Sequence, residues 1–494
     1  MLTGALTLAP TRLTSAAAGD ATTTVLSGHL DTGAADFVYL PIDVPRGVRE
    51  IAVSYTYDKL PVPSGTLGNS LDIGIFDERG IRLGGPGFRG WSGGFRTEFS
   101  IAADQATPGY LPGPVNAGTW HIALGPYQIA PQGLNYEVTV TLNFGASGTP
   151  FTPQYPPQQV PGRSRAWYRG DCHLHTVYSD GRRLPSEVAA GARAAGLDFI
   201  VSTDHNTSSS HAVWGPLAGG DLLIITGEEI TTRNGHYLAL GIPPGQWIDW
   251  RYRARDAVFD DFAEEIHDSG GLVVPAHPYC AFVACRWKFG YDVVDAVEVW
   301  NGPWTVDDES AVDTWDAMLV EAVRERRRWL PAMGNSDAHS EPQVIGLPHN
   351  VVLANALSKD AVTAALAAGR NWIAESSAVS LTFTATAGGH HAGIADRLPV
   401  SPDTPVQARL DVAGIPNGVV RIISDEGQVL QAQLPASGTG TITYPTTPSL
   451  AAYLRAEVRH LRPDGTPGNG NGMGPDLQLG PMAALTNPIF LGKA

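Results

Sequence analysis

The alternation of hydrophobic and polar positions changes character twice along the chain. In residues 20–145, short alternating runs are separated by Gly, Pro, Asn and Asp, and the clearest runs are 37–44, 50–57, 70–76, 120–124 and 136–142. Strands of this length, with no helical period between them, predict an antiparallel β-sandwich. Residues 146–165 are rich in Pro, Gly and Gln and predict a semi-extended linker.

In residues 166–376, apolar runs typical of buried strands alternate with helical segments. This pattern predicts a parallel sheet with crossover helices. Seven strands are expected to end near His173, Thr203, Gly227, Gly241, Ala276, Trp300 and Met333. Helices are expected at 185–195, 256–269, 306–328 and 358–368.

Short-period alternation returns in residues 377–494, at 380–386, 408–412, 419–423 and 453–458, with a Gly-rich loop at 465–474. We expect a second β-sandwich there. The predicted fold class is therefore α/β, with a central α/β domain flanked by an N-terminal and a C-terminal β-sandwich domain.

Composition adds limits to this picture. The chain has 494 residues, of which 43% are hydrophobic and 17% charged, and its formal net charge is -16. These values describe a soluble globular protein of about three domains. No apolar run approaches about 18 residues, so no membrane span is expected. The acidic charge argues against general binding of nucleic acid or of an anionic membrane.

The first residues and the cysteines bear on the compartment. Residues 1–18 are rich in Ala, Thr and Leu, and 16–19 resemble a small-residue cleavage site, although a basic stretch is lacking. An exported or periplasmic location is slightly favoured over a cytoplasmic one. Three cysteines leave at least one thiol free or intermolecular. Cys280 and Cys285 could pair or help to bind zinc, but packing or loop thiols are favoured over a metal role.

Candidate chemistry begins at residues 171–181, which read Asp-Cys-His-Leu-His-Thr-Val-Tyr-Ser-Asp-Gly. His173 and His175 are two apart, so their imidazoles point to the same side of a strand, as two ligands of one metal ion would. Asp180 follows a short turn ending in Gly181 and can reach the same site. The His-x-His pair alone is weak evidence, because it also occurs in plain strands.

Further strand ends carry the same residue types. The strands expected in the second, third, fifth and last places are followed by His or carboxylate residues: His205, Glu229, His277, and the pair Asp337 and His339. In a parallel barrel the carboxyl ends of all strands converge on one face, so these side chains should meet. His236 begins its apolar run instead of ending it, and it can face the site if residues 231–235 fold over the barrel mouth. Together these residues predict a metal centre.

The ordered motifs resemble those of the polymerase and histidinol phosphatase (PHP) superfamily over about residues 171–374. They are His173-x-His175, Asp180, Thr203-Asp204-His205, Gly227-x-Glu229, His236, Ala276-His277-Pro278 and Ser336-Asp337-Ala338-His339. The flanking β-domains, with residues 298–302 and 486–489, resemble the CehA/McbA branch, which includes carbaryl hydrolase. The resemblance implies a distorted (β/α)7 barrel, in agreement with the seven expected strands.

The resemblance also implies a ligand set for two or three divalent ions, with Zn, Mn or Fe as candidates. The first site would hold His173, His175, Glu229 and Asp337; the second Glu229, His236 and His277; the third Asp180, His205 and His339. Glu228 is a rival for the bridging position, but the Gly-x-Glu spacing favours Glu229. The three carboxylates of this ligand set carry a total charge of -3, and the imidazoles are neutral. Two divalent ions bring +4 and three bring +6, so the loaded site is net positive and suits an anionic substrate.

Such a centre predicts a metal-dependent hydrolase in which the ions activate water toward phosphorus or a carbonyl carbon. A phosphoesterase is expected first. An aryl carbamate or carboxylic ester hydrolase is the alternative, and a metal-stabilised binding module is the option outside enzymes. The expected partner is a small-molecule ester, anionic or aryl, and the flanking domains could bind carbohydrate or build a homo-oligomer.

Residues near the expected mouth are assigned supporting roles. His211 is a candidate acid for the leaving oxygen. Candidates to orient imidazoles are Asp204, Asn206, Asn301 and Asn335. Candidates to bind a phosphate are Arg182, Arg183, Arg233, Arg286 and Lys288. An aromatic rim could come from Trp214, Trp247, Trp250, Trp287 and Trp304.

Overall fold

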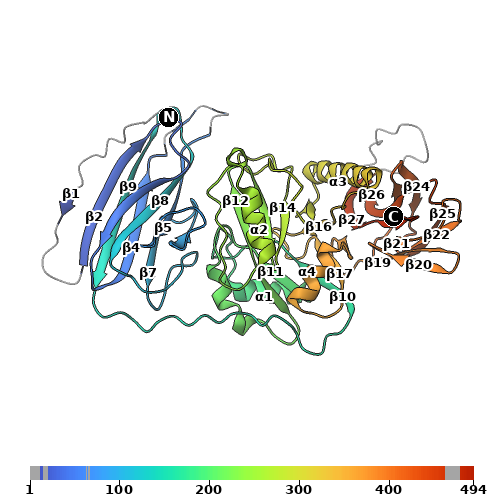
Figure 1. Ribbon diagram of the computed structural model, residues 1–494, viewed down its shortest axis with the longest axis horizontal. Coiled ribbons are helices and arrows are strands. Elements are labelled where there is room, and N and C mark those ends of the chain that lie inside the picture. The colour runs from blue at the N-terminus through green and yellow to red at the C-terminus, as the bar shows by residue number, and fades with distance from the viewer. Residues whose placement is uncertain are drawn as a thin grey trace.

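Three regions follow one another along the long axis of the protein (Figure 1). A computed structural model describes residues 12–14, 21–59, 61–62, 64, 67–461 and 479–493. The Gly-rich loop predicted at 465–474 and nearly all of the candidate export segment at 1–18 lie outside these residues. Among the described residues, no helix is both long enough and apolar enough to cross a membrane.

The N-terminal region consists of two antiparallel sheets. One has the order β1 (Arg12–Thr14), β2 (Ala21–Leu30), β9 (Leu134–Phe144), β4 (Val48–Tyr57) and β7 (Glu98–Ala102), and the other β3 (Val38–Val44), β8 (Gly118–Gln128), β5 (Ser70–Phe76) and β6 (Phe88–Trp91). Alternate residues point into a shared core: Ile51 and Val138 from the first sheet meet Ile73 and Ile122 from the second, and all four are fully buried. This is the arrangement that the two-residue period predicts.

The linker lies against the central region. Residues 146–165 form no helix or strand, and the Gln154 N–H donates to the Ala212 carbonyl at 2.8 Å and the Val160 N–H to the Leu357 carbonyl at 2.8 Å.

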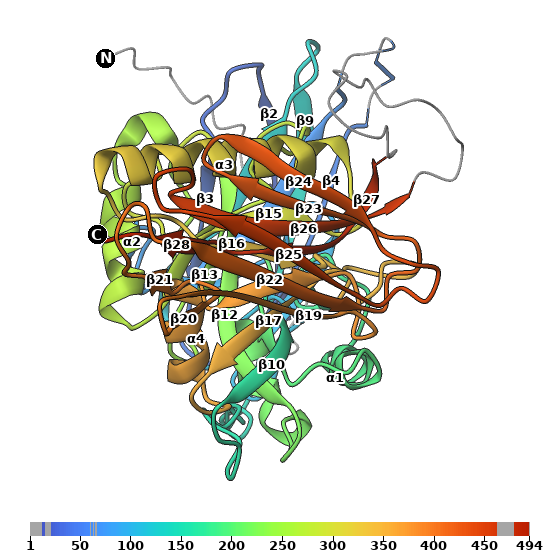
Figure 2. The same ribbon diagram turned by 90° about the vertical axis from the view of Figure 1, so that its right-hand side faces the viewer.

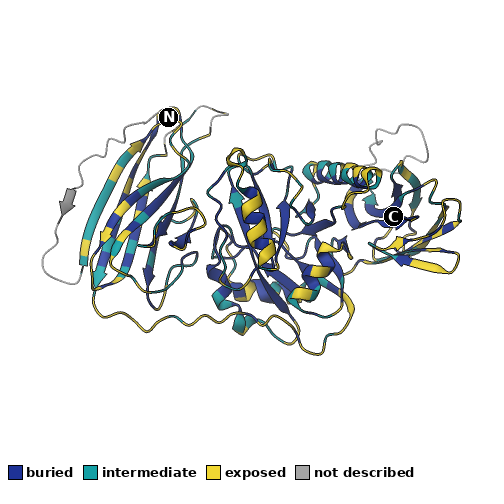
Figure 3. Ribbon diagram, viewed as in Figure 1, coloured by how far each residue is buried: buried dark blue, intermediate teal, exposed yellow. Residues whose placement is uncertain are grey.

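The central sheet has the strand order β14 (Leu272–Ala276), β13 (Gly235–Leu240), β12 (Leu223–Thr232), β11 (Phe199–Ser202), β10 (Ala166–Asp171), β17 (His349–Ala354) and β18 (Asn371–Ala374). A separate parallel pair is formed by β15 (Val297–Asn301) and β16 (Ala332–Asn335). The strands are buried along nearly their whole length, whereas the helices expose their outer faces (Figure 3).

The prediction of seven parallel strands closing a (β/α)7 barrel is wrong in its strand directions. In the central sheet, β10, β11 and β12 pair parallel with one another, whereas β13 and β17 run in the opposite direction. Strands β14 and β18 pair antiparallel with β13 and β17, and so run in the same direction as β10. The cause at β12 and β13 is local: only Arg233 and Asn234 separate them, and a two-residue connection can join only antiparallel strands. Strands β17 and β18 were not predicted as part of this sheet.

The helices agree with the predicted segments. They are α1 (Pro185–Ala194), α2 (Phe259–Asp268), α3 (Val306–Glu325) and α4 (Lys359–Ala367), with short 3-10 turns η1 (Ser209–Val213), η2 (Gly215–Leu217) and η3 (Ala254–Asp256). Helix α2 shows why: Phe259, Phe262, Ala263 and Ile266 form one buried stripe, and acidic residues fill its first turn.

The C-terminal region also has two facing sheets, but it shares one of them with the central region (Figure 2). The central sheet continues from β18 into β27 (Leu479–Thr486), β26 (Tyr453–Leu461), β23 (Val419–Ser424) and β24 (Gly427–Gln433), with β21 (Arg397–Leu398) and β28 (Ile489–Leu491) beside it. The facing sheet has the order β20 (His390–Gly393), β19 (Ser380–Ala387), β22 (Val406–Ala413) and β25 (Gly440–Thr446). The predicted boundary near residue 376 therefore separates chain segments without separating sheets.

Candidate metal centre

The predicted ligands lie together at one edge of the central sheet. Parallel strands β10 and β11 bring His173, His175 and His205 there just beyond their carboxyl ends, and β12 carries Glu229. The antiparallel strand β13 begins at this same edge, with His236 opposite Thr231 of β12. The unusual place of His236 at the start of its run is thus a consequence of the β12–β13 hairpin.

Two chain segments pair directly to bring the first ligands together. The Asp337 N–H donates to the His173 carbonyl at 2.9 Å, and the His175 N–H donates to the Ala338 carbonyl at 3.2 Å. This short ladder places the His-x-His strand beside the segment that carries Asp337 and His339.

The first group of ligands has the spacing of a coordination sphere. His173 Nε2 lies 3.2 Å from Glu229 Oε2 and 3.2 Å from Asp337 Oδ1, and His175 Nε2 lies 3.3 and 2.9 Å from the same two oxygens. A tetrahedron with ligand bonds near 2 Å has edges of about 3.3 Å. All four atoms are buried and none has a hydrogen-bond partner, which is rare for buried polar atoms and is relieved by a cation among them.

Glu229 lies at the middle of the remaining ligands. Its Oε1 is 3.0 Å from His236 Nδ1 and 3.1 Å from His277 Nε2, and its Oε2 is 2.9 Å from His205 Nδ1. A further group continues outward, in which Asp180 Oδ1 is 3.5 Å from His205 Nε2 and 3.2 Å from His339 Nε2. The structure therefore brings together all nine residues predicted as ligands, in groups that could each hold an ion.

Without an ion, the protonation states of the ligands differ. Burial acts to lower the pKa of His173, His205, His277 and His339, but nearby carboxylates outweigh it and raise the pKa, whereas Glu229 and His175 are already in the forms that coordinate a metal. Burial acts to raise the pKa of Glu229, but attraction by His205 and His173 outweighs it and holds the pKa well below its usual range. The pKa of His175 falls to about 3, first because of burial and then because of repulsion by His339 and His205. An ionised carboxylate and a neutral imidazole are the forms that bind metal ions.

Glu229, and not its neighbour Glu228, faces the cluster. Successive residues of β12 point to opposite faces, and Glu228 Oε2 accepts a hydrogen bond from the Ile248 N–H at 2.9 Å. Burial raises the pKa of Glu228 well above its usual value. The choice of Glu229 from the Gly-x-Glu spacing agrees with this geometry.

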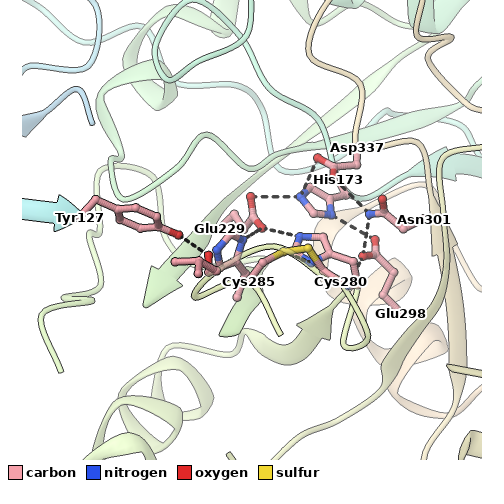
Figure 4. Close-up of a disulfide and its surroundings, with 11 residues drawn as sticks. Tyr127, His173, Glu229, Cys280, Cys285, Glu298, Asn301 and Asp337 are labelled. Carbon is pink, nitrogen blue, oxygen red and sulfur yellow. Dashed lines mark hydrogen bonds and ion pairs between the residues drawn. A yellow bond between two sulfur atoms is a disulfide. The ribbon is translucent and has the colours of Figure 1, made fainter. Parts of the chain in front are cut away.

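Glu298, to which no role was assigned from the sequence, forms hydrogen bonds with two of the ligand residues (Figure 4). Its Oε1 lies 3.1 Å from His173 Nδ1, and its Oε2 accepts from the backbone N–H of His277 at 2.8 Å. A proton on His173 Nδ1 leaves Nε2 free toward the other ligands. The signal in the sequence was an acid inside the apolar run that forms β15, because a carboxylate there needs partners. In the structure Glu298 is 1% exposed.

Two of the three asparagine candidates act on carboxylates instead of imidazoles. Asn335 Nδ2 donates to Glu298 Oε1 at 2.7 Å, and Asn301 Nδ2 donates to Glu298 Oε2 at 3.0 Å and to Asp337 Oδ2 at 3.3 Å. Asn206 caps the neighbouring strand, with its Oδ1 accepting from the Thr231 N–H at 2.8 Å.

Backbone strain collects at the site. His277 has φ 29°, Asp337 has φ 48° and Asn206 has φ 51°, in the left-handed region that residues other than Gly rarely occupy. Such strain persists only where surrounding contacts enforce it, and it is concentrated at functional sites.

Three of the residues predicted for supporting roles, His211, Asp204 and Arg182, make contacts other than the predicted ones. His211 is fully buried, its Nε2 bonds the Gly227 carbonyl at 2.8 Å and its Nδ1 accepts from the Gly245 N–H at 3.0 Å, so it has no free proton to give. Asp204 accepts from the Thr176 N–H at 2.8 Å and from the Ser179 hydroxyl at 2.7 Å, and so fixes the turn between His175 and Asp180. It reaches an imidazole through Ser179, whose Oγ lies 3.4 Å from His175 Nδ1. Arg182 lines a separate cavity beside Glu341.

Of the predicted tryptophans and arginines, some line a cavity beside the ligands and others are used in packing. Trp250 and Arg233 line a cavity next to the ligands, whereas Trp214 is fully buried and donates to Ser202 Oγ. Trp304 donates to Glu309 Oε1 at 2.7 Å, and Trp287 packs against Phe259 with ring centroids 5.4 Å apart. Trp247 stacks on Phe88 with ring centroids 4.1 Å apart, so of the predicted aromatic rim, all of which lies within the described residues, only Trp250 lines a cavity beside the ligands.

Cys280 and Cys285 form a disulfide, one of the two alternatives to free thiols that the sequence left open, and Cys172 is a buried free thiol. The disulfide closes a loop next to the ligands: the Cys280 N–H donates to the His277 carbonyl at 2.9 Å, and Cys285 Sγ lies 3.4 Å from His277 Nδ1. Tyr127 of the N-terminal region holds the tip of this loop by donating to the Val283 carbonyl at 2.6 Å (Figure 4).

The ligands lie between two cavities. One, of about 490 Å³, is bounded by the disulfide loop and the start of α3. The other, of about 410 Å³, is bounded by the N-terminal sheets and the β12–β13 turn. Asp180, His205 and His236 line both, so each cavity gives access to the centre.

Comparisons with known proteins give weak likenesses. No protein-family model matches the chain, and no curated protein matches it. Among solved structures, a two-domain protein from Bacteroides vulgatus, described as containing a predicted PHP-like metal-dependent phosphoesterase, is 14% identical with a TM-score of 0.34, covering 70% of this chain and 100% of its own. An amidohydrolase from Chromobacterium violaceum is 20% identical with a TM-score of 0.26, covering 36% of this chain and 89% of its own. These likenesses are too weak to assign the chain to a family.

Proposed function

We propose that the protein is a metal-dependent hydrolase of the PHP type and that it cleaves phosphoesters. The observation that carries this proposal is the convergence of four buried, unpartnered ligand atoms, on His173, His175, Glu229 and Asp337. Divalent ions held there would supply Lewis-acid chemistry, polarising an ester oxygen and favouring deprotonation of water.

The chain's own groups prepare the site for this chemistry. Glu298 holds the proton of His173 on Nδ1, and the Asp337 carbonyl lies 2.8 Å from His339 Nδ1 and holds the proton of that ring in the same way. Both rings therefore present Nε2 to the centre. Asp204 and the close approach of Gly181 to His175, where an added Cβ would lie 2.6 Å from the His175 carbonyl carbon, fix the turn that carries Asp180.

The site charge favours phosphoesters over neutral esters. With three carboxylates among neutral imidazoles, two or three divalent ions would leave the centre positive, and a phosphoester dianion gains most from such a site. An aryl carbamate or carboxylic ester is the second candidate, because aromatic side chains line the cavity of about 410 Å³ beside the ligands. Membership of the CehA/McbA branch, suggested by residues 298–302 and 486–489, would agree with that candidate.

One assay separates these candidates. The protein loaded with Mn, Zn or Fe is tested against an aryl phosphate, a phosphodiester and an aryl carbamate, with Asp337→Asn as the impaired variant and the exposed Asp43→Asn as its matched control. We expect phosphate release that Asp337→Asn lowers by at least about a hundredfold. Carbamate turnover without phosphate release would overturn the order of substrates, and no turnover of any ester would leave the binding module as the function.

We also propose that the protein matures in an oxidising compartment, since disulfides such as that between Cys280 and Cys285 form and persist mainly in such compartments. Counting thiols in protein isolated from its native source without reductant tests this proposal. One free thiol per chain, from Cys172, supports it, and three thiols contradict it. Assembly into a homo-oligomer stays a prediction.

A further inference from the structure

The N-terminal sheets supply one wall of a cavity at the metal centre. We call this the interdomain cavity; its volume is about 410 Å³. From the N-terminal sheets it is lined by Asp72, Trp91 and Tyr127, and from the central region by Trp250 and Arg233 together with the candidate ligands Asp180, His205 and His236. A cavity of this size accepts a small ligand of one ring.

Part of the wall is aromatic and preformed. The rings of Trp91 and Trp250 lie 4.8 Å apart, and Phe37 packs edge-on against both at 5.9 and 6.1 Å. Trp91 and Trp250 are 5% and 4% exposed, so these rings are fixed by packing before any ligand arrives. Such walls bind apolar and cationic groups.

Asp72 is the acidic residue that the N-terminal sheets contribute to this lining. Its neighbours Leu71 and Ile73 point into the sandwich core and are fully buried, so strand alternation directs Asp72 to the opposite face, toward the cavity. Among the described residues, none donates a hydrogen bond to its carboxylate and none forms an ion pair with it. Burial raises the pKa of Asp72 to about 7, with attraction by Arg233 acting in the other direction.

The nearest cation is occupied elsewhere. Arg233 donates to the Pro126 carbonyl at 2.6 Å and to the Tyr127 carbonyl at 2.7 Å, and its guanidinium lies 5.0 Å from the centre of the Tyr127 ring. The space beside Asp72 is kept open by Gly94, where an added Cβ would lie 3.0 Å from Asp72 Oδ1. A half-buried carboxylate that lines a cavity and has no hydrogen-bond or ion-pair partner among the described residues points to a ligand that brings one.

We propose that the interdomain cavity binds the leaving group of the substrate and that this group is an aromatic or similar apolar body carrying an ammonium, which pairs with Asp72. This rests on the proposed function for the adjoining ester bond. The charges are complementary: the ammonium would lie at Asp72, and the phosphoester would lie at the loaded metal centre on the Asp180, His205 and His236 side. Specificity for a zwitterionic phosphoester follows.

Binding of leaving-group mimics tests the cavity independently of hydrolysis. Benzylamine and benzyl alcohol are titrated by calorimetry into the full chain at about pH 8, where the amine is protonated and Asp72 largely ionised. We expect benzylamine to bind at least about tenfold more tightly than the alcohol, and Asp72→Asn to remove that preference. The control Asp43→Asn alters an exposed acid of the same sandwich and should leave the preference intact.

A second variant guards against misfolding of the first. Gly94→Ala places a Cβ against Asp72 without changing any charge and should weaken benzylamine binding, whereas Gly220→Ala, where an added Cβ meets nothing within 4 Å, should not. Equal binding of amine and alcohol, or an amine preference that survives both Asp72→Asn and Gly94→Ala, would overturn the inference.

Hydrolysis of a matched substrate pair separates this inference from the proposed function. The metal-loaded protein is assayed with para-(aminomethyl)phenyl phosphate and its isostere para-ethylphenyl phosphate. We expect kcat/KM to favour the amine at least about tenfold and Asp72→Asn to abolish that ratio while sparing the isostere. Equal turnover of both substrates contradicts the inference and leaves the hydrolase intact, whereas no turnover with amine binding retained contradicts only the hydrolase.

Discussion

Glu298 shows how a residue that binds no ion can set the geometry of a centre. One of its oxygens holds the His173 ring and the other holds the backbone of His277, so two ligands from β10 and β14 depend on one carboxylate. Each of its partners is a hydrogen-bond donor, and the carboxylate therefore acts only as an acceptor.

Glu298→Gln tests this role. The amide places an NH2 group against Asn301 or Asn335, which also donate, so the side chain must turn away from at least one ligand. We expect metal affinity to fall about 10- to 100-fold, measured by competition with a chelator. The exposed Glu264→Gln is the control, and an unchanged affinity in Glu298→Gln would show that the ligands hold their positions unaided.

His211 predicts a dependence of stability on pH. Burial lowers its pKa to about 4 in the folded protein, against about 6.5 in the unfolded chain. As the pH falls below 6.5 the unfolded state takes up the proton first, so a contribution of about 3 kcal/mol, complete above pH 6.5, is lost toward pH 4.

Urea unfolding at several pH values measures that loss. The difference in unfolding free energy between the wild type and His211→Gln should shrink as the pH falls from about 6.5 to about 4. The exposed His391→Gln should show a constant difference. A constant difference for His211→Gln as well would mean that its ring is charged in the folded state.

At this scale the sequence predicted the residues that could coordinate an ion and missed those that support or accompany them. The spacing of His173 and His175, and the place of His277 and Asp337 after strands, are visible in the chain order. The roles of Glu298 and Asp72 depend on which groups surround them, and those groups come from distant strands. His211 looked reactive by type, but two backbone partners occupy its ring.

At the scale of elements, the disulfide loop and the β12–β13 turn enclose the centre together. The Gly235 N–H donates to the Ala284 carbonyl at 2.8 Å, so the turn and the loop are joined. Phe282, at the tip of the loop, is 81% exposed, so the loop is held by the disulfide, by Tyr127 and by its backbone hydrogen bonds instead of by packing of its tip.

Replacing both cysteines tests the loop. In the Cys280→Ser, Cys285→Ser double variant, His277 loses the restraint of the closed loop, and metal affinity should fall on the order of tenfold or less. Proteolysis beside Phe282 should become faster at the same time. Cys172→Ser serves as the control, and unchanged affinity with unchanged proteolysis in the double variant would show that hydrogen bonds alone hold the loop.

Elements were predicted better than their directions. The runs of apolar residues located α1 to α4 and the strands that carry ligands. The prediction of parallel strands assumed a helical crossover between each pair of strands. Only two residues separate Thr232 at the end of β12 from Gly235 at the start of β13, so no crossover helix fits there. The pairing of β18 with β27 joins residues more than a hundred positions apart, and no local pattern reports it.

On the scale of the whole molecule, a chain of buried amides connects the C-terminal sheets with the metal centre. Asn487 donates to Asn371 Oδ1 at 2.9 Å, Asn371 to Asn350 Oδ1 at 3.2 Å, and Asn350 to Asn335 Oδ1 at 2.9 Å. Asn335 in turn donates to Glu298, which braces His173. The N-terminal region is joined to the central region by a salt bridge between Asp36 and Arg253, with 2.5 Å between Arg253 Nε and Asp36 Oδ2. Both flanking regions thus contribute to one site.

Asn487→Ala tests the connection. The backbone N–H of Ala332, which donates to Asn487 Oδ1 at 2.8 Å, would be left buried and unpaired. We expect the free energy of unfolding to fall by about 1–3 kcal/mol, measured in urea. The exposed Asn355→Ala is the control. A variant as stable as the wild type would show that another group replaces the missing amide.

The metal content of the protein decides whether the clustered side chains form a centre at all. The wild type, loaded with Mn or Zn and dialysed, should retain about two or three ions per chain by elemental analysis, and Asp337→Asn should retain at least about one fewer, while the exposed Asp43→Asn equals the wild type. Less than about one ion per chain in the wild type, or equal retention by Asp337→Asn, would contradict a metal centre built on His173, His175, Glu229 and Asp337.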